Sequence, residues 1–200
     1  QIGGKSLLQH VVDAINPLST SINIVIGNDA ELVKNSINNH SINWVIQKKQ
    51  LGTGHAVQQV KTGINNKSTC IILYGDVPLI STNTIKLLID QSHLTGFSIL
   101  SVTLDDPSGY GRIVRDKNKR VQAIIEHKDA DDDKQKINEI NTGIMAIRGS
   151  LLKKYISQLE PNNKQGELYL TDIVEIAASD NVTISSLVCD NVSEVMGINN

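Results

Sequence analysis

Residues 71–79 read Ile71-Ile72-Leu73-Tyr74-Gly75-Asp76-Val77-Pro78-Leu79, and they are the starting point for the fold. The apolar half predicts a strand that delivers Gly75 and Asp76 at its end, because Pro78 cannot continue a strand ladder. Gly75 allows a ligand to approach the backbone closely. The single carboxylate of Asp76 suits Mg²⁺, which takes oxygen ligands and shares them with substrate phosphates and water. The local sequence leaves an equal alternative open, in which Asp76 caps the following turn.

Strand and helix patterns alternate on both sides of this stretch. We expect strands over 22–26, 42–47, 69–74, 98–104, 140–147 and 183–188, and an antiparallel hairpin between 113–114 and 121–125. We expect helices over 7–15, 30–37, 82–91 and 151–159, the first of them capped by Ser6. Two further helices are expected, one that begins near His55 and one that Thr171 caps and that ends near residue 178. The apolar run 69–74 is typical of a central strand buried on both faces. This order predicts an α/β fold with a mostly parallel sheet, in which ligands bind at the carboxyl ends of the strands.

The composition narrows the class of protein. The chain has 200 residues, 40% of them hydrophobic and 20% charged, which excludes a disordered chain. The net charge of -2 argues against a nucleic-acid partner. No apolar run approaches the roughly 18 residues of a membrane span, so we expect no membrane partner. Cys70 and Cys189 have no metal or redox spacing and fit a reducing cytoplasm.

Polar residues and glycines follow the second predicted strand. Gln47 can both donate and accept a hydrogen bond, as the recognition of a pyrimidine edge requires. Gly52 and Gly54 enter a helix, which would direct free N–H groups and the positive end of the helix dipole toward a ligand. For His55 we favour a packing or helix-start role over that of a catalytic base.

Three further positions lie at predicted strand ends. Gly111 offers a backbone N–H group or simply a turn, Glu126 can accept hydrogen bonds from sugar hydroxyls, and the amide of Asn141 can do the same. Each taken alone has an equally good structural explanation. Residues 131–133, three aspartates in a row, predict a solvated loop rather than a metal cluster.

Seven segments in order resemble the uridylyltransferase domain of the bacterial N-acetylglucosamine-1-phosphate uridylyltransferases, within the wider family of sugar-phosphate nucleotidyltransferases. They are QKKQLGTGHA (47–56), YGDVPLI (74–80), LDDPSGYGRI (104–113), IEHKDA (125–130), EINTGI (139–144), GELYLTDI (166–173) and SEVMGINN (193–200). The resemblance covers essentially the whole chain. It implies one domain over 1–200 with a Rossmann-like mixed α/β sheet of the nucleotide-diphospho-sugar transferase type.

The resemblance also implies a site and a reaction. UMP would pass from UTP to N-acetylglucosamine-1-phosphate, giving UDP-N-acetylglucosamine, a precursor of peptidoglycan and lipopolysaccharide, and pyrophosphate. The implied residues are Asp76 and Asn199 for Mg²⁺; Gln47, Gly52, Thr53, Tyr74, Gly75 and Asp76 for the nucleotide; and Gly111, Glu126, Asn141, Tyr169 and Thr171 for the sugar. The rivals are a related hexose-1-phosphate nucleotidyltransferase and a non-catalytic nucleotide-sugar-binding module.

Parts of the family pattern do not occur in this sequence. The family opens with a strand, a glycine-rich loop of Leu-Ala-Ala-Gly-x-Gly-Thr-Arg type and a Pro-Lys that grips the phosphates, and Lys5 does not lie in that context. We therefore assign no catalytic residue in this chain, and expect two unpaired strand edges, weak folding and no turnover. A parent protein would form a homotrimer through a β-helix acetyltransferase domain, which this sequence does not contain.

Overall fold

The computed structural model describes residues 1–27, 30–38 and 41–198. The strands are β1 Ile22–Ile26, β2 Ile42–Ile46, β3 Thr69–Ile72, β4 Phe97–Thr103, β5 Arg112–Arg115, β6 Val121–Ile125, β7 Glu139–Arg148 and β8 Ser185–Val188. The helices are α1 Leu7–Ile15, α2 Ala30–Asn35, α3 Thr53–Gln58, α4 Thr82–Thr95, α5 Asp132–Gln135, α6 Gly149–Ile156, α7 Asp172–Ser179 and α8 Val192–Val195, with a 3₁₀ turn at Lys61–Gly63. No helix of the described residues is both long and apolar enough to cross a membrane.

The strands form two sheets. The larger has the order β6-β5-β7-β4-β8, with β3 also paired to β7, and the smaller consists of parallel β1 and β2. The mixed α/β sheet expected from the resemblance is confirmed. The expectation of a mostly parallel sheet is wrong, because β4 and β8 are the one parallel pair among the described strands of the larger sheet. The hairpin of β5 and β6 is confirmed.

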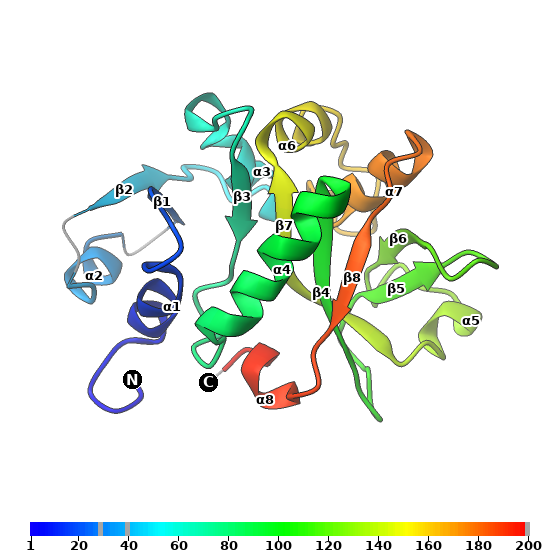
Figure 1. The fold of residues 1–200 in the computed structure, drawn as a ribbon, viewed down its shortest axis with the longest axis horizontal. Coiled ribbons are helices and arrows are strands. Elements are labelled where there is room, and N and C mark those ends of the chain that lie inside the picture. Colours follow the sequence, from blue (N-terminus) through cyan, green and yellow to red (C-terminus); the bar gives the residue numbers. More distant parts are fainter. Residues whose placement is uncertain (28–29, 39–40, 199–200) are drawn as a thin grey trace.

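The expectation for residues 69–74 needs correction. β3 ends at Ile72, and all four of its residues are only partly buried. The reason is that β3 pairs with β7 alone, and β1 pairs with β2 alone, in the part of the chain that the structure describes. Figure 1 shows β1 and β2 at one side of the molecule, apart from β3. β1, β2 and β3 thus each have one described strand partner, and the expectation of two unpaired edges inside the sheet stays a prediction.

Helices cover both faces of the larger sheet. Side chains alternate along β4, so that Phe97 and Ile99 pack with α6 and α7, whereas Leu100 and Val102 pack on the opposite face with α4, α1 and α8. In Figure 1, α4 crosses in front of the sheet, and α6 and α7 lie at its upper end. Because both faces are buried, β4 and β7 are rigid supports for the residues that follow the neighbouring strands.

Several local predictions can be compared with the structure. Ser6 caps α1 as expected, with its hydroxyl accepting a 3.1 Å hydrogen bond from the amide of Gln9. Thr171 precedes α7, but its side chain makes no capping hydrogen bond, so this part of the prediction is wrong. Asp131 does not lie in a simple loop, because its carboxylate caps α5. Helix α8 was not expected, since its four residues carry too little periodicity.

Candidate functional site

Strand β7 changes its partner along one edge, and the candidate site lies at this change. Ile140 pairs with Arg112 of β5, whereas Met145 pairs with Ile72 of β3. Between them β7 contains a bulge relative to β4, and Gly143 within it has φ +81°. Bulges of this kind reorient side chains and are frequent beside active sites. The last residue of β3 and the first residue of β5 therefore lie along the same edge of β7, on either side of residues 141–144.

Tyr74 occupies the space above the bulge. A Cβ atom on Gly143 would lie 2.9 Å from Cζ of the Tyr74 ring, so only glycine allows this contact. The pKa of Tyr74 is raised to about 12, mainly by burial and also by the carboxylates of Glu126 and Asp76, while the hydroxyl of Thr53 opposes the rise. Tyr74 is therefore neutral at physiological pH, and it is near enough to Glu126 and Asp76 for both carboxylates to affect its pKa.

The residues expected at the sugar are brought together. Thr171 Oγ1 donates a 3.0 Å hydrogen bond to Glu126 Oε1, and a Cβ on Gly111 would lie 3.2 Å from Glu126 Oε2. The backbone N–H of Asn141 donates a 2.8 Å hydrogen bond to the carbonyl oxygen of Gly111. Burial is the largest effect on Glu126 and raises the pKa of its carboxyl, while the bond from Thr171 lowers it. Tyr169, also buried, accepts a 2.6 Å hydrogen bond from Gln165.

The expected nucleotide loop is held against the segment that contains Tyr169. The backbone N–H of Gly54 donates a 2.8 Å hydrogen bond to Leu168 O, and the N–H of Leu168 donates one of 2.8 Å to Leu51 O. Thr53 Oγ1 accepts a 3.0 Å hydrogen bond from the backbone N–H of Leu170. This corrects the expectation of free N–H groups at the start of α3, because the N–H of Gly54 is already bonded. The loop and the sugar segment are thus one connected unit.

Gln47 and His55, considered separately in the sequence, are in contact. Gln47 Nε2 lies 3.1 Å from Gly52 O and 2.9 Å from His55 Nδ1. Sequence reasoning missed this pair, although the spacing of eight residues across a glycine turn could have suggested it. The loop connects this pair to the segment that contains Tyr169, through Leu168 and Leu170.

The backbone of Asp76 is bonded to the C-terminal segment. The amide of Ile198 donates 2.8 Å to Asp76 O, and a Cβ on Gly197 would lie 3.2 Å from Asp76 Oδ2. Asn199, the other expected metal ligand, lies outside the described residues. Ser81 caps α4, so Asp76 does not cap that helix, and the alternative that Asp76 caps the turn after β3 stays open.

The donor set at Asp76 fits a shared magnesium ion rather than a protein-enclosed one. No described group of three or more His, Cys, Asp or Glu side chains could hold a metal. Mg²⁺ needs few protein oxygens when substrate phosphates complete its shell, so one free carboxylate is compatible with it.

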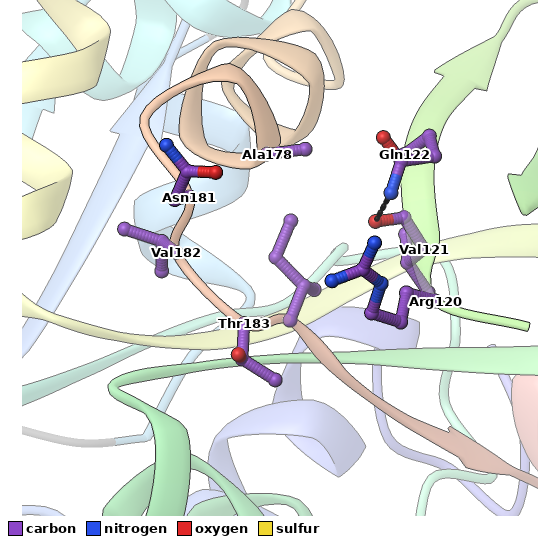
Figure 2. A pocket seen from close by; sticks show the side chains of 8 residues that line it. Arg120, Val121, Gln122, Ala178, Asn181, Val182 and Thr183 are labelled. Carbon is purple, nitrogen blue, oxygen red and sulfur yellow. Dashed lines mark hydrogen bonds between the residues drawn. The ribbon is translucent and has the colours of Figure 1, made fainter. Parts of the chain in front are cut away.

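Two cavities lie near α7. One, of about 570 Å³, adjoins Glu126 and Tyr169 and is also lined by Asp129, Asp172 and Glu175. Burial raises the pKa of Asp172 to about 6, with further contributions from Glu175 and Glu126. The smaller cavity, of about 140 Å³, is lined by residues 120–122, Ala178 and residues 181–184. None of the expected site residues is among those that Figure 2 draws around it. The smaller cavity is therefore separate from the candidate site.

The fold and this site define a nucleotidyltransferase, and the chain belongs to the nucleotidyl transferase family, whose model matches residues 1–190. It is similar to "Bifunctional protein GlmU" of Vesicomyosocius okutanii subsp. Calyptogena okutanii (strain HA), with 50% identity over 99% of this chain. It is 46% identical, over the same share, to the protein of that name from Ruthia magnifica subsp. Calyptogena magnifica. The chain spans 44% of the length of each of these relatives.

Solved structures agree on the fold. A UDP-glucose pyrophosphorylase complexed with UDP-glucose has a TM-score of 0.71 at 17% identity, covering 90% of this chain and 77% of that one. A putative glucose-1-phosphate thymidylyltransferase from Bacillus anthracis in complex with a sucrose has a TM-score of 0.68 at 20% identity, covering 92% and 74%. The resemblance and the Rossmann-like nucleotidyltransferase fold expected from the sequence are confirmed.

Proposed function

We propose that this chain forms the uridylyltransferase site of an enzyme that transfers UMP from UTP to N-acetylglucosamine-1-phosphate. The observation that carries the proposal is the convergence around Tyr74. Its ring packs on Gly143, two residues from Asn141, and the carboxylates of Glu126 and Asp76 both act on its hydroxyl. Described members of the sets assigned to sugar, nucleotide and metal, namely Glu126, Thr53 and Asp76, thus all act on one tyrosine.

The sugar would be held by the Glu126 group. Thr171 occupies Oε1 of Glu126, which leaves Oε2 to accept a hydrogen bond from a sugar hydroxyl. Gly111 lies against this carboxylate, and any side chain there would press on it. Tyr169 and Thr171 would close over the sugar from the other side. This arrangement supports an amino-sugar phosphate, and a panel of hexose-1-phosphates would separate it from the related transferases.

The chemistry needs no protein nucleophile. An oxygen of the sugar phosphate, already ionised, would attack the α-phosphorus of UTP, and the bond to the bridging oxygen would break to release pyrophosphate. Bound Mg²⁺, held by Asp76 and Asn199, would neutralise phosphate charge. The chain's own contribution would be alignment: the Gly52–Gly54 loop and Gln47 position the base, and the Glu126 group positions the sugar.

Further parts of the proposal come from the relatives. We infer a single nucleotidyltransferase domain over 1–200, a cytoplasmic location, and no nucleic-acid or membrane partner. The relatives are named "Bifunctional protein GlmU", which supports a parent protein with a second activity. For that parent we propose an acetyltransferase domain and a homotrimer. Phosphate-gripping Arg and Lys residues are expected from a strand and glycine-rich loop that this sequence does not contain, so we expect no turnover from these 200 residues alone.

The test is pyrophosphate release from UTP, N-acetylglucosamine-1-phosphate and Mg²⁺. The protein is this chain extended by a family-type first strand and loop, measured beside its Asp76→Ala variant and the unextended chain. Activity that needs both Asp76 and the extension supports the proposal. A folded, extended protein that binds the nucleotide sugar without turnover would instead indicate a binding module. Rapid turnover by the unextended chain would refute the expected inactivity.

A further inference from the structure

The hydrogen bonds of the Gln47 amide leave only one of its polar atoms for a ligand. The backbone of Gln47 is anchored at the end of β2, where its N–H donates 2.8 Å to Ile26 O. Its side-chain nitrogen lies 3.1 Å from Gly52 O and 2.9 Å from His55 Nδ1. A carbonyl oxygen only accepts, so the amide nitrogen is the donor at Gly52, and its second hydrogen points to His55.

This geometry also sets the tautomer of His55. Nδ1 must accept from Gln47, so the ring proton of the neutral imidazole lies on Nε2. Gln59 lies next to the ring, and its Nε2 donates 3.0 Å to the backbone oxygen of His55. The side-chain contact between Gln59 Nε2 and His55 Nε2, at 3.2 Å, is longer than the one to Gln47 and joins two donors in this tautomer. The bond from Gln47 therefore determines the state of the ring.

We propose that His55 is a positioning residue that fixes the Gln47 amide with its oxygen toward the nucleotide base, so that the site selects bases with a ring N–H, uracil or thymine, over cytosine. Both amide hydrogens are used inside the protein, and Oε1 is the remaining group. Oε1 can accept from N3–H of uracil or thymine, whereas N3 of cytosine is itself an acceptor. Without His55, the bond to Gly52 O alone would hold the amide nitrogen, and the amide oxygen would be aimed less strictly at the base. The inference rests on the proposed function, which assigns Gln47 to the base.

The site of this pair supports the role. Gln47 and His55 are both partly buried, so water competes less for their bond than at an exposed position. Gly52, whose carbonyl takes the first amide hydrogen, is fixed by φ +104° and by Leu168, which any Cβ at Gly52 would contact. The amide is thus held by two groups, Gly52 O and His55 Nδ1, and not by the Gln47 side chain alone.

The experiment is calorimetric binding of UTP, CTP and 3-methyl-UTP to this chain, extended by the same family-type first strand and loop as in the activity test, and to three variants of it. His55→Phe keeps a ring and removes the acceptor, His55→Asn restores an acceptor near Nδ1, and His93→Phe changes an exposed histidine of α4 as a control. We expect UTP to bind best, and His55→Phe to reduce the UTP-to-CTP affinity ratio about three- to tenfold, the value of one net hydrogen bond. His55→Asn should recover most of the ratio.

The outcomes separate the two proposals. If the extended protein without substitutions binds none of the nucleotides, the proposed function fails and this inference with it. If UTP binds and His55→Phe leaves the ratio unchanged, the inference alone is overturned. Nitrogen-15 NMR of the unsubstituted chain gives a second readout that needs no variant to fold. An unprotonated Nδ1 on His55 is expected, and a proton on Nδ1 would overturn the inference.

Discussion

Thr171 Oγ1 donates a 3.0 Å hydrogen bond to Oε1 of Glu126, and this bond joins the start of α7 to the end of β6. The hydroxyl is available because it does not cap its own helix. Burial raises the pKa of the Glu126 carboxyl, and the bond from Thr171 opposes that rise by stabilising the ionised form. Thr171 therefore helps to keep a buried carboxylate charged at the proposed sugar position.

Replacing Thr171 by Val removes this bond while keeping the shape of the side chain. We expect the pKa of Glu126 to rise further, so that the acidic limb of the pH–activity profile of the extended protein moves to higher pH. KM for the sugar phosphate should rise about three- to tenfold, as for one net hydrogen bond. Thr183→Val, at an exposed position by the separate small cavity, is the control. An unshifted acidic limb in Thr171→Val would contradict the role of the bond.

Gly143 provides the second test. Alanine at φ +81° is strained, and its Cβ would push the Tyr74 ring away. We expect Gly143→Ala to lower the free energy of unfolding by about 1–3 kcal/mol and to weaken UTP binding. Urea unfolding and calorimetry measure the two effects. Gly63→Ala is the matched control, because a Cβ there meets nothing within 4 Å. Equal behaviour of the two variants would show that the Tyr74 contact is unimportant.

The same glycine shows where sequence reasoning reached its limit. The strand-end position of Glu126 was predictable, because apolar runs with β-branched residues define where a strand stops. Asn141 lies instead inside β7, two residues after its start. The bulge around Gly143 was not predictable, since extra residues in β7 relative to β4 leave no periodic signal in one strand alone. The partial burial of β3 could not be predicted from the sequence either. An apolar run indicates that a strand can be buried, and the neighbouring strands decide whether it is.

Side-chain partners were a further limit. The Gln47–His55 bond depends on how Gly52 turns the chain, with φ +104°, and single-residue propensities do not encode that turn. The hydroxyl of Thr171 could cap α7 or bind Glu126, and the choice depends on the distance between α7 and β6. Sequence patterns located the residues of the candidate site, and tertiary contacts determined which atoms remain for a ligand.

Asp172 lies in the first turn of α7 and lines the larger cavity. Its folded pKa of about 6 lies above its usual 3.8, mainly because of burial. Its contribution to stability is therefore present below about pH 4 and is lost as the pH rises through 6. We expect Asp172→Asn to be more stable than the unsubstituted chain by about 1–2 kcal/mol at pH 7.5, allowing for solvent screening.

Urea unfolding of Asp172→Asn at pH 7.5 and pH 4 tests this sign. The advantage should be nearly absent at pH 4, where the aspartate is protonated in the folded state. Asp133→Asn, whose side chain is 93% exposed, should change little at either pH. A variant equally stabilised at both values would mean that the charge of Asp172 is not the cause.

Glu139 is the opposite case, a carboxylate that the fold stabilises. Arg115 donates two hydrogen bonds to the Glu139 carboxylate, from Nε to Oε2 at 2.8 Å and from Nη2 to Oε1 at 2.6 Å. Oε1 of Glu139 also accepts hydrogen bonds from the hydroxyls of Ser101, at 2.7 Å, and Ser186, at 3.3 Å. One side chain thus connects β7 with β5, β4 and β8. Burial is the largest single effect and raises the pKa of Glu139, but the bonds from Arg115, Ser101 and Ser186 together outweigh it and lower the pKa below 4.5.

Glu139→Gln should therefore lose stability at neutral pH, by about 2 kcal/mol, because charge-assisted bonds are replaced by neutral ones. A group with a lowered folded pKa contributes stability above its unfolded pKa and loses it as the pH falls through the folded value. The difference from the unsubstituted chain should thus shrink below about pH 4. Urea unfolding at pH 7 and pH 3.5 measures this difference in the free energy of unfolding. Asp90→Asn is the control, because Asp90 forms an exposed ion pair with Lys86. A difference independent of pH would assign the effect to packing rather than to charge.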